Sequence, residues 1–255
     1  TAVEGGGAFG VVNGEMVLDH CALAWNSGPI GGLLFGSESA VSVSNSEIFA
    51  CSATMGAVFS MNNCTIDMRN VSASFNQADE GGGFAFLLYG TLSLHDCELH
   101  SNTAGGAGAA VILARSVISI ENSSFFNNTA GTGTVYGESN GTLTVSNTSF
   151  VQNTGILSGG ALHLVLNSTG IVTNCSFINN TASNLGGVGI ITRSSLSLSQ
   201  CQFLENSSPG GGSFTGITAQ LNISDSIFVN GTSQGGGCVV CTERCNVRIQ
   251  NVMFT

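Results

Sequence analysis

The chain repeats itself at intervals of 25 to 27 residues over its whole length of 255 residues. One unit reads Leu196-Ser-Leu198-Ser-Gln-Cys201-Gln-Phe203-Leu-Glu-Asn206, and the same frame recurs throughout the chain. A fixed period of this size is the signature of a solenoid or a similar array. We therefore expect residues 1–255 to form one continuous array of ten units, aligned on Leu23, Ile48, Ala73, Leu99, Phe125, Phe150, Phe177, Phe203, Phe228 and Phe254.

Apolar side chains alternate with a period of two inside each unit, as in Leu196-x-Leu198, which indicates short strands. Three such strands per unit are separated by Gly, Asn, Ser and Thr, and no segment is long enough for a helix. Leucine-rich repeats, the main rival at this period, are disfavoured because a helical half is missing. The pattern predicts an all-β fold, a single-stranded parallel β-helix in which each strand pairs with its equivalent one coil later.

The register also predicts which side chains point inward. The Phe position should form an internal stack, and the small residues two positions earlier share its parity. Three positions after Phe, Asn recurs at Asn26, Asn76, Asn102, Asn128, Asn153, Asn180 and Asn206, and Cys51 and Gly231 interrupt this column. Because side-chain amides of neighbouring coils can bond one another, we interpret these asparagines as an internal ladder.

Two signatures of the repeat, Gly-Gly-Ala-aliphatic at Gly159–Leu162 and Phe-x-x-Asn at four successive units from Phe125 to Asn206, resemble the polymorphic outer-membrane protein repeat. That repeat occurs in chlamydial surface proteins and in large extracellular proteins of some eukaryotic microbes. The resemblance covers the whole chain and implies a right-handed β-helix on a cell surface, acting as an adhesin or scaffold. Nothing in this sequence matches the outer-membrane barrel of the bacterial members, so an autotransporter would lack its second half here. The sequons and cysteines described below favour a eukaryotic extracellular member.

Composition excludes several classes of partner. Only 8% of the residues are charged, the formal net charge is −10, and there is no lysine. Nucleic acid and anionic membranes attract basic surfaces, so neither is expected as a partner. No apolar run is long enough to span a bilayer, so direct membrane insertion is not expected. The absence of an initiator Met indicates a mature or cut segment of a longer chain.

Nine cysteines suggest disulfides in an oxidising compartment. Cys241 and Cys245 lie close together in one loop and are candidates for a local disulfide. Cys175 and Cys201 share an inward column in adjacent coils, where either a disulfide or a stack of buried thiols fits the strand spacing. A zinc site at Cys238, Cys241 and Cys245 lacks a fourth ligand, so no metal or other cofactor is expected.

Twelve Asn-x-Ser/Thr sequons mark potential N-glycosylation sites. Four of their asparagines lie three residues before the Phe position, with a parity that points outward, and Asn206 falls in the internal ladder and should stay bare. The expected acceptors are Asn70, Asn122, Asn147 and Asn174, followed by Asn63, Asn127, Asn140, Asn167, Asn179, Asn222 and Asn230. Outward sequons and cysteines together favour an extracellular or cell-surface location.

Some β-helices are polysaccharide lyases or hydrolases, which need clustered carboxylates. Here the acidic residues are dispersed, and the best group is Asp96 and Glu98 beside His95 and His100. We interpret this group as a solvated patch and expect no catalytic residues. The predicted function is a structural scaffold or spacer in a surface protein, coat or filament, joined end to end with other copies or subunits. The alternatives are an adhesin, or a carbohydrate-active enzyme whose active face lies in another segment.

Overall fold

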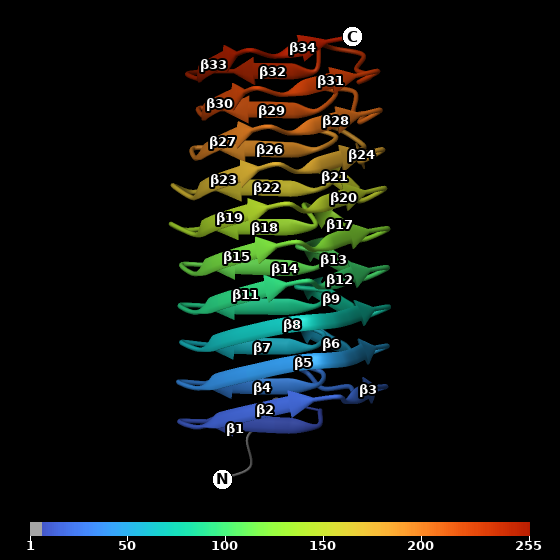
Figure 1. Ribbon diagram of the computed structural model, residues 1–255, viewed down its shortest axis with the longest axis vertical. Coiled ribbons are helices and arrows are strands. Elements are labelled where there is room, and N and C mark those ends of the chain that lie inside the picture. The colour runs from blue at the N-terminus through green and yellow to red at the C-terminus, as the bar shows by residue number, and fades with distance from the viewer. Residues whose placement is uncertain (1–6) are drawn as a thin grey trace.

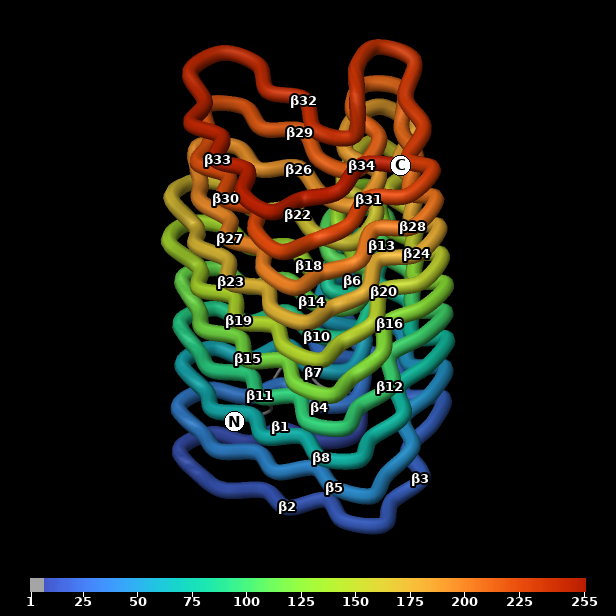
Figure 2. Tube along the Cα trace, turned by 45° about the horizontal axis from the view of Figure 1, so that its top comes forward, coloured from blue at the N-terminus to red at the C-terminus, as the bar shows by residue number. Residues whose placement is uncertain are grey.

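The protein is described by a computed structural model that covers residues 7–255. All of its regular structure is β-strand, and every pairing between strands is parallel and joins one coil to the next. Figure 1 shows the coils stacked in chain order along one axis, and Figure 2 shows that successive coils overlie one another. Within residues 7–255 no helix is long and apolar enough to cross a membrane.

Face A is a sheet of ten strands that follow the glycine-rich segments. Nine turns join its ten layers, which confirms the predicted parallel β-helix and its spacing of about 26 residues. The strands are β1 (Phe9–Val12), β4 (Leu34–Ser37), β7 (Phe59–Asn62), β10 (Ala85–Leu88), β14 (Val111–Ala114), β18 (Val135–Glu138), β22 (Leu162–Val165), β26 (Gly189–Thr192), β29 (Phe214–Ile217) and β32 (Val239–Thr242).

Face B contains the Leu-x-Leu segments. Its strands are β2 (Glu15–Asp19), β5 (Ala40–Phe49), β8 (Thr65–Ser74), β11 (Thr91–His95), β15 (Val117–Glu121), β19 (Thr142–Ser146), β23 (Thr169–Thr173), β27 (Ser195–Ser199), β30 (Gln220–Ser224) and β33 (Asn246–Gln250). The long strands β5 and β8 continue around a corner onto the next face.

Face C carries the Phe column. It consists of the last parts of β5 and β8 together with β3 (Ala22–Ala24), β12 (Glu98–His100), β16 (Ser124–Phe126), β20 (Ser149–Val151), β24 (Ser176–Ile178), β28 (Gln202–Leu204), β31 (Ile227–Val229) and β34 (Met253–Phe254). Every predicted partner in the Phe column is paired in register, from Leu23 with Ile48 to Phe228 with Phe254. From Phe125 onward the rings stack with centroids 4.4 to 5.2 Å apart.

A fourth face, face D, was not predicted. It is a sheet of six short strands in coils two to seven: β6 (Ser52–Met55), β9 (Gln77–Gly81), β13 (Thr103–Ala107), β17 (Thr129–Thr132), β21 (Thr154–Ser158) and β25 (Thr181–Ala182). These segments are rich in Gly, Thr and Ala, and they lack the alternating large apolar residues by which strands are recognised in a sequence.

The Gly-Gly signature forms the corner between faces D and A. Gly159 has a φ of 61°, and a Cβ atom there would lie 2.7 Å from the Leu162 carbonyl oxygen. A Cβ atom on Gly160 would lie 2.3 Å from the Gly187 carbonyl oxygen of the next coil. The first glycine therefore permits the left-handed backbone, and the second permits close stacking of the coils.

The predicted asparagine ladder is confirmed as an internal feature between faces C and D. The six asparagines from Asn76 to Asn206 are fully buried. In the middle of the ladder, Nδ2 of Asn153 donates to Oδ1 of Asn180 at 3.0 Å and to the Phe125 carbonyl oxygen at 2.9 Å. The ladder thus satisfies side-chain and backbone groups that the turn would otherwise bury without partners.

Candidate functional site

The corner between faces B and C, here called the B–C corner, contains the four sequon asparagines with the clearest outward prediction. Each coil turns there at one residue with a φ between 48° and 55°. Asn and Asp adopt this left-handed conformation more readily than most other side chains. The column of corner residues is His20, Asn45, Asn70, Asp96, Asn122, Asn147, Asn174, Gln200, Asp225 and Asn251.

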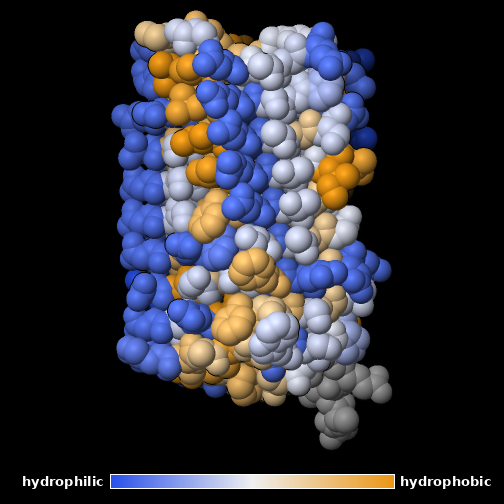
Figure 3. All heavy atoms as spheres, turned by 90° about the vertical axis from the view of Figure 1, so that its right-hand side faces the viewer, coloured by the Kyte–Doolittle hydropathy of each residue, from blue (hydrophilic) through white to orange (hydrophobic). Residues whose placement is uncertain are grey.

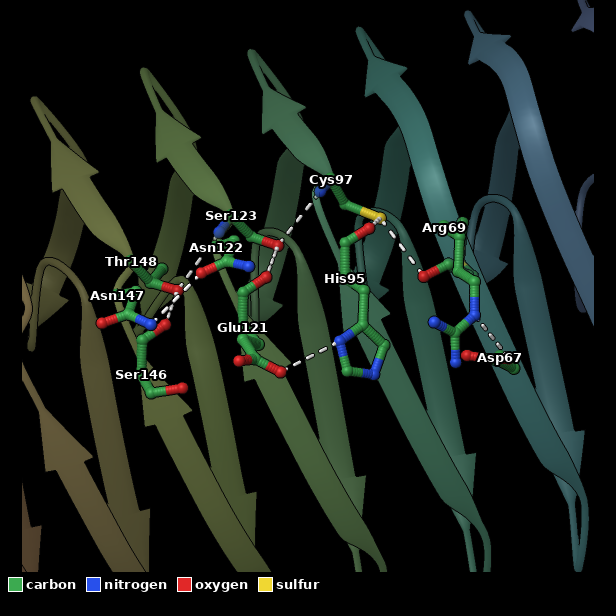
Figure 4. A network of polar contacts seen from close by, with 11 residues as sticks. Asp67, Arg69, His95, Cys97, Glu121, Asn122, Ser123, Ser146, Asn147 and Thr148 are labelled. Carbon is green, nitrogen blue, oxygen red and sulfur yellow. Dashed lines mark hydrogen bonds and ion pairs between the residues drawn. The ribbon is translucent and has the colours of Figure 1, made fainter.

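Exposed amides of this column bond from coil to coil. Nδ2 of Asn174 donates to Oδ1 of Asn147 at 2.8 Å. Nδ2 of Asn147 in turn donates to Oδ1 of Asn122 at 3.2 Å (Figure 4). Asn70 makes the same contact with Asn45 at 3.0 Å. The three consecutive sequons at Asn122, Asn147 and Asn174 therefore form a solvent-facing row of carboxamides along the solenoid axis.

Beneath this row lies a second ladder, made by the small inward residues. The Cys97 backbone N–H donates to the Ser123 hydroxyl at 3.1 Å, and the Ser123 N–H donates to the Thr148 hydroxyl at 3.3 Å (Figure 4). These hydroxyls accept the N–H groups of the preceding coil. The outer amides are therefore not needed to satisfy the backbone of the turn.

A shallow polar groove follows the B–C corner. One part, of about 370 Å³, lies along Asn147 and Asn174 and is floored by Thr148 and Cys175. A second part, of about 420 Å³, continues along Asp225 and Asn251. Gln200 and Gln202 line both parts, so the groove crosses several coils. The walls of the first part present amide and hydroxyl groups, which suit a neutral polar ligand or an attached sugar, whereas Ile227 and Met253 make the second part more apolar.

Charged side chains gather on face B beside the same corner. Nε of Arg69 lies 3.1 Å from Oδ2 of Asp67, and Nδ1 of His95 lies 3.3 Å from Oε2 of Glu121 (Figure 4). The other Asp67 oxygen is buried and has no hydrogen-bond partner among residues 7–255. The predicted group at Asp96 and Glu98 is divided: His100 faces Glu98 at 3.7 Å, whereas His95 pairs with Glu121 in the next coil.

The remaining sequon asparagines lie mostly at the other two corners of the coil. Asn63, Asn140 and Asn167 occupy the corner between faces A and B, and Asn127, Asn179 and Asn230 occupy the corner between faces C and D. All six have positive φ, and only Asn222 lies within a strand, β30. The outward column at the B–C corner was predicted and these two were missed, although at all three corners an outward Asn precedes an inward side chain, such as Cys64, Asn128 or Cys175.

The nine cysteines comprise one local disulfide and seven free thiols, five of which are buried. Cys241 and Cys245 are disulfide-bonded. The disulfide considered for Cys175 and Cys201 is absent, and both are buried free thiols, so the thiol stack is the correct alternative. Their side chains leave adjacent parallel strands in the same direction, and each Sγ lies 3.2 Å from the carbonyl oxygen two residues before it. The hydrogen bond to Cys201 and burial raise the pKa of Cys175.

The fold agrees with a comparison to known protein families. The sequence profile described as right handed beta helix region matches residues 89–254. The chain belongs to this right-handed β-helix family. Over 180 residues the β-helix is also 31% identical to metabotropic glutamate receptor-like protein R of Dictyostelium discoideum. This match covers 69% of the present chain but 11% of that protein, and no solved structure matches the chain.

A half-buried histidine on face A of the β-helix, with its Nδ1 atom fully buried, is expected to make the stability sensitive to acid. His163 packs edge-on against the Tyr136 ring, with centroids 5.1 Å apart, and its Nδ1 has no partner within residues 7–255. Burial lowers the pKa of His163 to about 4. Between pH 6.5 and 4, His163 therefore binds a proton in the unfolded chain but not in the folded chain.

We expect this difference to reduce stability as the pH falls, by about 1.4 kcal/mol per pH unit at most. Urea unfolding at pH 7.5 and pH 4.5 measures the effect. The variant His163→Ile places the residue of the next coil, Ile190, at this position and should be less sensitive to acid. An equal loss of stability in both proteins would assign the acid sensitivity to other groups.

Proposed function

We propose that this β-helix is a rigid, N-glycosylated, extracellular segment of a cell-surface protein. The observation that carries the proposal is the position of the sequons. Ten of the eleven expected acceptor asparagines, all except Asn222, lie at left-handed corners on the outside of the solenoid, whereas Asn206 is fully buried. Sugars on these corners would extend away from the coils without disturbing the stacked core.

Two further features support a surface location. The similar protein from Dictyostelium is named a receptor-like protein, and the chain contains a disulfide, a bond that persists in oxidising compartments. A solenoid in which every coil is hydrogen-bonded to its neighbours is also suited to hold attached groups at a fixed distance. Stacking on further coils or copies along the axis belongs to this proposal.

We also propose that the chain is a eukaryotic member of the polymorphic outer-membrane protein repeats. The stacked Phe column, the asparagine ladder and the Gly-Gly corner give each residue of the two repeat signatures a structural role. The β-helix family contains enzymes as well as proteins without catalytic activity, and we propose that this segment is not catalytic. The pairing of Asp67 with Arg69 and of His95 with Glu121 supports a structural role for the charged side chains.

Glycopeptide analysis tests the proposal. The chain is secreted from eukaryotic cells, treated with a glycosidase in heavy-oxygen water, and analysed by mass spectrometry for labelled aspartate. We expect sugar at one or more of Asn70, Asn122, Asn147 and Asn174. Asn206 is the internal control, because its sequon is buried and should remain unlabelled. Sugar on Asn206, or unmodified asparagine at all twelve sequons, would contradict the proposal.

A further inference from the structure

Face C and its corner with face D display aromatic rings on the outside of the first five coils. Figure 3 shows apolar groups gathered on this side of the molecule, over the coils near the N-terminus. We call the set Trp25, Phe49, Phe75, His100 and Phe126 the aromatic patch. In coils six to nine the same outward position on face C holds the aliphatic side chains of Val151, Ile178, Leu204 and Val229.

The rings follow one another along the solenoid axis. His100 stacks on Phe126 with centroids 4.5 Å apart and planes within 4° of parallel. Phe75 meets the other side of His100 edge-on at 5.7 Å. Trp25 occupies the corner position two coils before Phe75, and its backbone N–H donates to the Phe49 carbonyl oxygen at 3.2 Å. The patch is therefore an ordered row of rings from several coils.

Stability does not explain this arrangement. Phe75 lies in the third coil, between coils on both sides, and is 64% exposed with a φ of 55°. A bulky side chain is unusual in this backbone conformation, which is strained for it. Within residues 7–255 the same corner in other coils holds polar or small side chains, at Ala50, Ser101, Asn127, Gln152, Asn179, Glu205 and Asn230, and a second aromatic one only at Trp25. A strained and exposed aromatic residue, in place of the favoured asparagine, indicates selection for a contact with another molecule.

Charge indicates what kind of molecule makes the contact. Glu47 and Glu98 project from face C on the same side as the rings, and both are exposed. Beyond them, Asp79 and Glu80 are exposed on β9, and the chain has no lysine. Aromatic faces carry negative charge density and attract guanidinium and ammonium groups. Rings interspersed with carboxylates are thus complementary to a positively charged partner.

We infer that the aromatic patch is a docking site for a basic, arginine- or lysine-bearing segment of a partner protein. Its cationic side chains would lie over Trp25 and Phe75 and pair with Glu47 and Glu98. Aromatic and arginine side chains contribute strongly to protein interfaces, which fits this pairing. The inference goes beyond the proposed scaffold and does not depend on glycosylation.

The single tryptophan of the chain, Trp25, is 80% exposed and reports binding by its fluorescence. The probe is a short peptide of alternating glycine and arginine, compared with a glycine-serine peptide of the same length. We expect a saturable change with the arginine peptide only. Phe75→Asn leaves the net charge unchanged and should weaken binding about fivefold, since a partly desolvated cation–π contact contributes on that scale. Glu98→Gln should also weaken it.

The matched control is Tyr89→Asn, and all variants are compared in unglycosylated chains because this substitution creates a sequon with Gly90 and Thr91. Tyr89 is likewise an exposed aromatic residue at a left-handed corner, with a φ of 55°, but it lies between faces A and B. This variant should bind the arginine peptide as the unchanged chain does. Equal weakening by both variants would show that the peptide binds exposed aromatic rings without preference for the patch, and no weakening by either would show attraction to the net negative charge alone; both outcomes would overturn the inference. A response only to a neutral oligosaccharide such as cellohexaose would identify a sugar platform and overturn the inference. Thermal unfolding of Phe75→Asn at or above the midpoint of the unchanged chain excludes loss of structure as the cause.

Discussion

Replacing Phe177 by alanine is expected to lower the free energy of unfolding by about 3–5 kcal/mol. The ring is fully buried and lies between Phe150 and Phe203, with centroids 4.9 and 5.2 Å away. Coils above and below are held by backbone hydrogen bonds, so they cannot close the space that the ring leaves. Chemical denaturation followed by circular dichroism measures the change.

Phe177→Leu is the conservative control, because Leu99 occupies the same column earlier in the solenoid. It should cost roughly half as much as the alanine variant, since the leucine fills part of the volume. Losses below about 1 kcal/mol for Phe177→Ala would mean that the stack contributes little beyond what neighbouring aliphatic residues provide. A broad, less cooperative unfolding transition would instead show that the substitution destabilises the coils on either side of Phe177 more than the rest of the solenoid.

The register of the solenoid could be predicted because every coil repeats the same alignment of residues. Each coil must bury its apolar face against the next coil, so one strong marker such as Phe203 fixes the alignment of every other position. The inward parity of Cys97 and the internal ladder at Asn102 followed from that marker alone. Both predictions used only the spacing of residues and the period of a strand.

The parts that could not be predicted depend on backbone conformation rather than on side-chain pattern. Besides the glycine corner, each coil has three left-handed corners, and two of these were missed because residues such as Tyr89, Arg115 and Phe75 adopt positive φ there, against their own preference. Face D was missed because its strands pair through Gly, Thr and Ala. The choice between a disulfide and two thiols at Cys175 depends on side-chain direction, which strand spacing does not determine.

Changing Asn153 to aspartate should have the second large effect, about 3–5 kcal/mol at neutral pH. Oδ1 of Asn153 accepts from the backbone and side-chain N–H groups of Asn128, at 3.1 and 3.0 Å. A carboxylate can keep these contacts, but it cannot donate to Oδ1 of Asn180 or to the Phe125 carbonyl oxygen. The variant therefore buries a charge and leaves two acceptors facing it without a proton.

The matched control lies in the same coil. Asn147→Asp makes the same chemical change in the solvent-facing row of carboxamides at the B–C corner. There, water solvates the carboxylate and aspartate tolerates the left-handed backbone. In unglycosylated chains it should alter stability by less than about 1 kcal/mol.

The two variants should also differ in their response to acid. Burial raises the pKa of a carboxyl group, so the penalty at position 153 is absent below the unfolded pKa of about 4 and grows as the pH rises from there toward the folded value. Urea unfolding at pH 3.5 and pH 7 should therefore show the Asn153→Asp deficit shrinking in acid, measured against Asn147→Asp. A deficit that is equal at both pH values would mean that the buried charge is not its cause.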